Sequence, residues 1–343
     1  MGSLLAVLVN PLVGGMADRT GGSKFILIGL IILASVASAT LFAAPTPLAV
    51  ALVYLVCRFI SAPLIPLSES ILIANLAAYR LEFGRVRAWG SVSVVVTTLL
   101  CGYLVDWSGP AVIVILLTLV LAIQAGFALA LPRRVRDGEG GPSSAAAITI
   151  ALRSRSFLLL VGSAAISQAC HGVFYAYSTF RWLDAGYTTF DIGLFWAIGV
   201  AAEIIAFACG GWITARLSPG TIIAIGCIAG VLRWGTFAYS TELLATLFMQ
   251  LLQGATLGMT QIGVAAYLRR HIRPHTLSSA TGSYAASSAL IASLFIFAAG
   301  HAYAVSSGSV FLCASAFCVL ALAVAGTLVR LERNAPISGG KAS

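Results

Sequence analysis

The sequence predicts an all-α integral membrane protein, and three observations support this class. Hydrophobic residues make up 59% of the 343 residues, charged residues only 9%, and the mean hydropathy is +0.99. A soluble globular protein carries about 25% charged residues, so this chain lacks the side chains for a water-exposed surface. Long charge-free stretches also recur, such as the 33 residues between Lys24 and Arg58. These features exclude an ordinary soluble enzyme, a nucleic-acid-binding domain and a disordered scaffold.

The charge-free stretches predict eleven membrane-spanning helices, because a span needs about 20 apolar residues. The longest stretch, 56 residues between Arg273 and Arg330, has to fold back on itself, with the break around His301 to Gly308. When stretches interrupted by single charges are included, the predicted spans are 2–17, 25–43, 47–77, 88–106, 110–131, 157–181, 189–215, 219–239, 243–268, 277–299 and 305–329. The runs are too long, and alternate too little between apolar and polar residues, for a transmembrane β-barrel.

The Lys and Arg residues predict the orientation of these spans. Threading alternate loops to one side places 17 of the 20 basic residues together, while Arg181 falls in an opposite loop and Arg58 and Arg233 lie within spans. Cytoplasmic loops of membrane proteins carry an excess of Lys and Arg. The net charge of +9 therefore reflects the orientation of the spans in the membrane. We expect a multi-pass protein of the inner membrane whose C-terminus lies in the cytoplasm.

A polar segment predicts two bundles. Residues 132–155 are rich in Pro, Gly, Ser and charges, which is typical of a linker. We expect an N-terminal bundle of five spans at 1–131, a cytoplasmic linker at 132–155, a six-helix bundle at 156–330 and a cytoplasmic tail at 331–343.

No sequence pattern indicates a cofactor, a metal or catalysis. All seven cysteines lie in apolar stretches, where they are expected to act as small buried hydrophobes. The chain contains no Cys-x-x-Cys pair, no nucleotide-binding Gly-x-x-x-x-Gly-Lys-Ser/Thr loop and no nucleophile–base arrangement. We therefore expect no enzyme, no cofactor, no bound metal and no nucleic-acid partner.

A short loop after the first span carries a recognisable motif. It begins at Gly14 and continues through Asp18, Arg19 and Gly21, so that it has the form Gly-x-x-x-Asp-Arg-x-Gly. Glycines permit a tight turn and close helix packing, and the Asp18 carboxylate can accept N–H groups from the start of a neighbouring helix. This loop resembles the signature between the second and third helices of the major facilitator superfamily. The resemblance implies a two-bundle fold, with this loop involved in conformational change.

Further segments resemble the phenylpropionate permease branch of that superfamily, which is related to the lactose permease and to nucleoside proton symporters. The stretch from Leu81 to Ser91 is similar to the start of the fifth helix in these permeases, and Glu69 stands 18 residues ahead of Arg87, an offset found in both branches. The later similar stretches are 171–178, 193–204 and 232–235.

The chain also departs from the family pattern. Numbering the spans by the resemblance leaves no counterpart of the first helix, and either a truncation or a misassigned start would account for it. Gln253 stands where a histidine is common, and Thr256 stands where the galactoside branch has a glutamate. The proton route of that branch therefore cannot be copied onto this chain.

Four charged residues within the predicted spans are the strongest functional candidates. Each charged group at bilayer mid-depth costs about 2.5–3.5 kcal/mol, so Arg58, Glu69, Glu203 and Arg233 would together cost on the order of 10 kcal/mol if unpaired. They are expected to be paired or to face a water-filled cavity. Arg58 matches no family residue, and pairing with a glutamate or a gating role are both open.

Two charge pairs follow from the order of the spans. Glu203 and Arg233 lie on consecutive spans, so that an ion pair is geometrically reasonable and movement of the arginine would change the proton affinity of the carboxylate. We expect this pair to couple transport to protons, although a static bridge between two helices is the alternative. Glu69 and Arg87 are expected to form a second pair. In this pair, Arg87 binds an anionic substrate, or binds Glu69 when no substrate is present.

Other polar and aromatic side chains are weaker candidates for substrate binding. His171 titrates near neutral pH in water, and Gln253 could face the cavity. Tyr175, Tyr177 and Trp196 could stack on an aromatic substrate. For each of them an ordinary packing or interhelical hydrogen-bonding role is the alternative.

The predicted function is that of a secondary active transporter that takes up a small organic substrate together with protons by alternating access. The resemblance implies a phenylpropionate-like aromatic acid and a monomer. A sugar or nucleoside proton symporter, or a non-transporting truncated or sensor-type membrane protein, are the alternatives.

Overall fold

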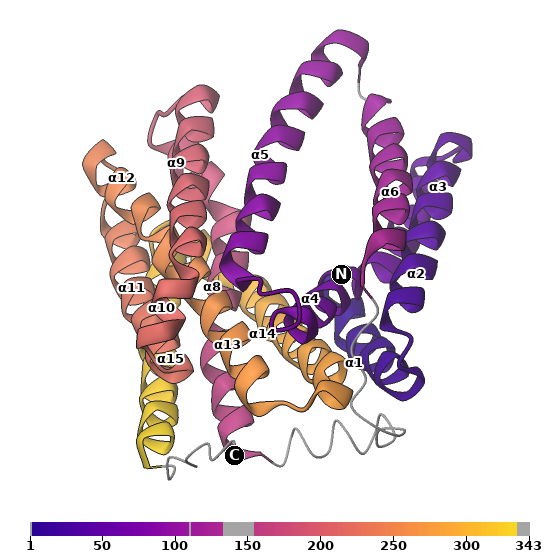
Figure 1. The fold of residues 1–343 in the computed structure, drawn as a ribbon. Coiled ribbons are helices and arrows are strands. Elements are labelled where there is room, and N and C mark those ends of the chain that lie inside the picture. The colour runs from indigo at the N-terminus through magenta and orange to yellow at the C-terminus, as the bar shows by residue number, and fades with distance from the viewer. Residues whose placement is uncertain (1, 110, 133–153, 335–343) are drawn as a thin grey trace, which may run out of the picture. The chain divides into compact units, whose positions relative to one another are not determined.

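The computed structural model describes residues 2–109, 111–132 and 154–334, and all regular structure in these ranges is helical (Figure 1). The predicted linker at 132–155 falls almost entirely outside the described residues, as does the tail beyond Asn334. The first group of elements is α1 (Gly2–Thr20), α2 (Ser23–Ala39), η1 (Thr40–Ala43), α3 (Pro47–Ser61), α4 (Leu64–Asn75), α5 (Phe83–Ser108) and α6 (Val112–Ala130). The second group is α8 (Arg155–Asp184), α9 (Thr189–Ala208), α10 (Gly210–Arg216), α11 (Pro219–Tyr239), α12 (Leu243–Leu251), η2 (Gly254–Met259), α13 (Thr260–His271), η3 (Pro274–Thr276), α14 (Leu277–Val305) and α15 (Ser309–Asn334).

Helices occupy all eleven positions at which spans were predicted. Within the described ranges, nine helical segments are long and apolar enough to cross a membrane. The other two predicted spans correspond to α1 and α5, which are helices of 19 and 26 residues. The all-α membrane class is therefore confirmed. The break predicted around 301–308 is shorter in the structure. It is confined to residues 306–308, so that His301 lies inside α14.

The described residues form two compact units. The first contains α1 to α6 together with α14 as far as Phe297, and the second contains α8 to α12, η2, most of α13, the last residues of α14 and α15. The predicted boundaries between an N-terminal and a C-terminal bundle stay a prediction, because α14 contributes residues to both units.

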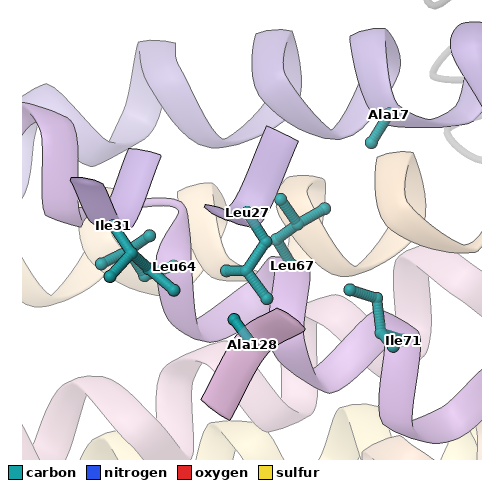
Figure 2. Packing of buried hydrophobic residues seen from close by; sticks show 7 residues of the cluster. All are labelled: Ala17, Leu27, Ile31, Leu64, Leu67, Ile71 and Ala128. Atoms are coloured by element: carbon teal, nitrogen blue, oxygen red, sulfur yellow. The ribbon is translucent and has the colours of Figure 1, made fainter. Parts of the chain in front are cut away.

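The core of the first unit lies where α1, α2, α4 and α6 meet. Figure 2 shows side chains from these four helices in one cluster, namely Ala17, Leu27, Ile31, Leu64, Leu67, Ile71 and Ala128. The helices α2, α3 and α6 run side by side in this unit (Figure 1). Apolar side chains that point away from this cluster are exposed, as Leu8, Leu33 and Phe127 are. That pattern suits helices whose outer surface faces lipid.

Proline interrupts the predicted span 47–77. The helix α3 ends at Ser61 and α4 begins at Leu64, with Pro63 between them and Pro66 in the first turn of α4. Proline has no N–H and its ring clashes with the carbonyl four residues earlier, which breaks the helix. The kink predicted from Pro63 and Pro66 is therefore present.

Charged side chains neutralise several helix ends. The Lys24 ammonium donates to the carbonyls of Leu129 and Leu131, each at 2.6 Å, at the C-terminal end of α6. In the second unit, the Glu332 carboxylate accepts from the Gly220 N–H at 3.0 Å, at the start of α11. Helix C-termini favour cations and N-termini favour anions. These contacts satisfy backbone groups that lipid could not.

The opposite end of α11 is held by Arg181. Its Nε donates to the Phe237 carbonyl at 2.9 Å, and its Nη2 donates to the Ala238 carbonyl at 2.9 Å. The Nη1 atom donates to the Ser307 hydroxyl at 2.6 Å. This arginine, the one basic residue predicted in an opposite loop, thus ties the ends of α8 and α11 to the turn before α15.

The predicted motif loop is helical as far as Thr20, because these residues continue α1, and only Gly21 and Gly22 separate α1 from α2. The motif residues at the end of α1 pack against the start of α14 within the first unit. A Cβ atom built on Gly14 would lie 2.5 Å from the Ser278 carbonyl oxygen, and one built on Gly282 would lie 2.5 Å from the Asn10 carbonyl oxygen. Only glycine permits these backbones to pack so closely. Gly21, at φ +61°, adopts the left-handed conformation that glycine tolerates without strain, and it ends α1.

We expect Gly14→Ala to destabilise the protein by about 1–3 kcal/mol, because the added methyl group would separate α1 from α14. Gly29→Ala is the matched control, since no atom lies within 4 Å of a Cβ at that position of α2. Relieving glycine's entropy cost should leave this control unchanged or stabilise it by about 0.5–1 kcal/mol. Denaturant titration of the purified protein in detergent measures both values, and equal stability of the two variants would contradict this packing.

Candidate functional site

The second unit is built around a buried arginine. Arg233 lies on α11, whose start is capped by the Ser218 hydroxyl and whose first position is Pro219. Its side chain is 0% exposed. The guanidinium lies over two aromatic rings, 4.6 Å from the Phe174 centroid and 4.5 Å from the Trp234 centroid. The negative faces of these rings attract the cation and supply part of the stabilisation that water would otherwise give.

The hydrogen bonds of Arg233 go to uncharged partners on η2, α12 and their junction. Its Nη1 donates to the Thr256 hydroxyl at 2.9 Å, and its Nη2 donates to Gln253 Oε1 at 2.7 Å and to Gln250 Oε1 at 3.1 Å. All three partners are buried. The guanidinium is therefore held by a neutral polar cluster inside the unit, which we call the Arg233 cluster: Arg233, Gln250, Gln253, Thr256 and His171.

Local backbone features place these acceptors together. Gln250, Gln253 and Thr256 are spaced three residues apart, which puts them on one face of a helix, and the segment Gly254–Met259 is a π-helix. Such segments are rare and occur frequently at functional sites. A Cβ on Gly199 of α9 would lie 2.9 Å from Gln253 Oε1 and 3.2 Å from Gln250 Nε2. Glycine at this position thus leaves room for the two amides.

Hydrogen-bond geometry defines the state of His171. Its Nδ1 lies 3.1 Å from the Ser167 carbonyl oxygen, so this nitrogen has to carry the proton. Its Nε2 lies 3.3 Å from Arg233 Nη1 and 3.0 Å from the Thr256 hydroxyl. Because a guanidinium has no acceptor, Nε2 has to accept from it. The imidazole in this cluster is therefore neutral and protonated on Nδ1.

Glu203 lies beside the cluster. It is on α9, its side chain is 6% exposed, and its carboxylate interacts electrostatically with Arg233. This interaction is consistent with the prediction that these two residues of consecutive spans lie close to one another. The hydrogen-bond partners given above for Arg233 are nevertheless amides, a hydroxyl and an imidazole, which the charge pattern alone did not indicate.

The second predicted pair lies in the other unit. Glu69 on α4 and Arg87 on α5 interact electrostatically, and both side chains are partly buried. Tyr284 on α14 also interacts electrostatically with Glu69. Arg58, by contrast, has an exposed side chain in the last turn of α3.

The predicted aromatic residues occupy separate places. Tyr175 is 53% exposed and stacks on Trp196, with the ring centroids 5.5 Å apart at an interplanar angle of 17°. Tyr177 stacks instead on Tyr303, with the centroids 5.0 Å apart. Residues two apart on a helix point in different directions, so one ligand ring cannot contact both tyrosines on α8 in the same way.

The carboxylate of the motif loop has the predicted partners. Asp18 accepts from the Ser278 N–H at 3.1 Å and from the Ser279 N–H at 2.7 Å, at the start of α14. The favourable interaction of an anion with a helix N-terminus stabilises this contact. Arg19, the next residue, is exposed.

Sequence reasoning missed several members of the site. Gln250, Phe174 and Trp234 were not singled out, and Thr256 was noted only as a departure from the galactoside branch. The three-residue spacing of Gln250, Gln253 and Thr256 was a usable signal, because it predicts one polar face on an otherwise apolar span. Among the described residues, no group of His, Cys, Asp and Glu could hold a metal ion.

Comparison with known proteins agrees with this architecture. The described residues form two apolar helical units, and the second holds the polar Arg233 cluster. The sequence model of the MFS_1 like family matches residues 2–322, and the chain belongs to this family.

Individual relatives are more distant. The probable 3-phenylpropionic acid transporter of Escherichia coli (strain K12) is 30% identical over 210 residues, which cover 60% of this chain and 55% of that protein. The maltose permease of Geobacillus stearothermophilus is 25% identical over 82% of this chain and 72% of its own length. The chain thus spans about half the length of the first of these relatives.

Solved structures share the fold at low identity. FucP, a major facilitator superfamily transporter crystallised in the outward conformation, superposes with a TM-score of 0.74 at 12% identity, covering 96% of this chain and 88% of that one. The human organic anion transporter MFSD10 gives a TM-score of 0.72 at 16% identity, covering 94% and 82%. At these identities the likeness concerns the fold alone.

We expect Gly199→Ala to disrupt the Arg233 cluster, because the new methyl group would displace Gln250 and Gln253 from the guanidinium. The loss of close packing and of buried hydrogen bonds should cost about 1–3 kcal/mol of unfolding free energy. Gly193→Ala on the same helix is the control, since a Cβ at Gly193 meets no atom within 4 Å. Denaturant titration in detergent compares the two, and a Gly199→Ala protein as stable as the control would contradict the assigned packing.

Proposed function

We propose that this protein is a secondary active transporter that couples the uptake of a small organic substrate to protons by alternating access. The observation that carries the proposal is the Arg233 cation, which is fully buried among neutral acceptors beside Glu203. Charged groups inside membrane spans are costly, and they mark substrate and proton pathways. The membership of the MFS_1 like family supports the same class.

The proposed substrate is a small aromatic acid of the phenylpropionate type. The similarity to a probable 3-phenylpropionic acid transporter supports this choice. In the first unit, Arg87 is the cation that suits a carboxylate, because a guanidinium binds it through two parallel hydrogen bonds, and Glu69 is a further polar candidate. In the second unit, Arg233 is the corresponding cation, His171 and Gln253 are polar candidates, and Tyr175 or Tyr177 offers an aromatic surface.

The proposed coupling group is Glu203 with Arg233 as its partner. A protonated Glu203 loses the attraction to the guanidinium and an ionised Glu203 gains it, so its protonation shifts the balance between two arrangements of the site. The contact of Asp18 with the start of α14, together with Gly14, Arg19 and Gly21, would favour one of these arrangements. We further propose a monomer in the inner membrane with a cytoplasmic C-terminus, consistent with the distribution of basic residues.

A sugar or nucleoside proton symporter is the second candidate. The amides of Gln250 and Gln253 and the Thr256 hydroxyl are groups that bind hydroxyl-rich ligands. Similarity to the maltose permease and to the putative nucleoside transporter of Escherichia coli (strain K12), which is 24% identical over 82% of this chain and 69% of that one, also favours this alternative.

The decisive experiment measures uptake by purified protein in liposomes with an inward proton gradient, using 3-phenylpropionate, maltose and uridine in parallel. We expect uptake of 3-phenylpropionate by the unmodified protein. Glu203→Gln should slow gradient-driven uptake at least about tenfold, because the amide cannot release a proton, while exchange of labelled for unlabelled substrate continues. Glu242→Gln, an exposed position before α12, is the matched control.

The results separate the candidates. Uptake of maltose or uridine alone would replace the aromatic acid by the second candidate. Gradient-driven uptake that is unaffected by Glu203→Gln would contradict the assigned coupling group, and no uptake of any of the three compounds would contradict transport.

A further inference from the structure

The contacts of His171 and Arg233 oppose protonation of the imidazole. His171 Nε2 faces Arg233 Nη1 at 3.3 Å and accepts from it, while Nδ1 already carries its proton toward the Ser167 carbonyl. A second proton on the ring would place a donor against a donor and a cation against a cation. As long as the guanidinium stays in this position, His171 has to remain neutral.

The guanidinium is itself held by partners weaker than an anion. Its acceptors are two amide oxygens and a hydroxyl, and its Nε is buried without a hydrogen-bond partner among the described residues. Hydrogen bonds between a guanidinium and a carboxylate are roughly twice as strong as those to neutral acceptors, and they form in pairs. A carboxylate that reached Arg233 would therefore displace neutral acceptors from it.

We propose that Arg233 and His171 together form a site that binds one carboxylate and one proton. The substrate carboxylate takes over the N–H donors of Arg233, and His171 Nε2, which then faces an anion instead of a cation, accepts a proton from water. This inference deepens the proposed function, on which it rests: it makes the substrate class a monocarboxylate and assigns the proton taken up on binding to His171, while Glu203 keeps its proposed role in the change between the two arrangements of the site.

Joint binding keeps the net charge of the buried site constant, because a carboxylate adds one negative charge and the proton adds one positive charge. The bound carboxylate accepts from both the guanidinium and the protonated imidazole, so that neither donor faces the other without an anion between them.

The other charged or titratable groups near this site are few. Glu203 on α9, Tyr175 on α8 and Cys318 on α15 interact electrostatically with Arg233. The segments α12 and η2 present only the amides and the hydroxyl of the Arg233 cluster. Glu203 is therefore the rival proton acceptor, and the test has to separate the two residues.

The experiment is isothermal titration calorimetry of the full chain in detergent with 3-phenylpropionate, repeated in buffers of different ionisation enthalpy to count protons. We expect uptake of about one proton per bound anion. In the pH range where free His171 is neutral, Kd should therefore rise about tenfold for each unit by which the pH increases. His171→Gln should bind without proton uptake and without this pH dependence. Glu203→Gln should still take up a proton on binding, and His301→Gln, at an exposed position on α14, should behave like the unmodified protein.

A second measurement does not depend on any variant folding. In protein labelled with ¹⁵N at histidine, saturating 3-phenylpropionate should convert one of the four imidazoles from the neutral to the cationic pattern of ring-nitrogen shifts. Binding without proton uptake, uptake that persists in His171→Gln, or four unchanged imidazoles would each overturn the proposal. Loss of proton uptake in Glu203→Gln alone would overturn it in favour of Glu203 while leaving the proposed transport function intact. A protein that binds no 3-phenylpropionate but transports maltose or uridine would overturn the carboxylate site alone.

Discussion

The burial of the Arg233 guanidinium is the constraint around which the second unit is organised. A cation without water has to receive compensation from the protein, and here it comes from two aromatic faces and four hydrogen-bonding contacts to neutral groups. Each contact requires a particular element: α8 supplies Phe174 and His171, and the segment from α12 to η2 supplies the amides and the hydroxyl. Because none of these acceptors is charged, the arginine remains attractive to an anion, which a buried ion pair would not allow.

Charged side chains likewise satisfy buried backbone groups at the helix ends. Lys24, Glu332, Arg181 and Asp18 each satisfy backbone groups at the end of another helix. In a membrane these contacts matter more than in water, because lipid offers no replacement hydrogen bonds. Close packing through Gly14, Gly230 and Gly258 then brings helix surfaces together without a hydrophobic driving force, since lipid is as apolar as the side chains.

Much of the fold could be predicted from the sequence. Apolar stretches predicted eleven spans, each of which is helical in the described residues, prolines predicted the break after Ser61, and the motif predicted the carboxylate at a helix start. The site could be predicted less fully. The in-span charges identified Glu203 and Arg233, but the partners of Arg233 include Gln250 and Thr256, whose polarity alone did not mark them. The closeness of Gly199 to both amides depends on the register of α9 against α12, which no local pattern specifies.

The sequence by itself determined that this protein resides in a lipid bilayer and which segments of its chain cross that bilayer, because hydropathy and charge act locally and add along the chain. Which buried charge meets which acceptor was decided only by the tertiary structure, since helix rotation and spacing bring together residues as distant in sequence as His171 and Thr256. The neutral state of His171 is the clearest case: it follows from one neighbour at 3.3 Å and another at 3.1 Å, and neither distance can be obtained from the order of the residues.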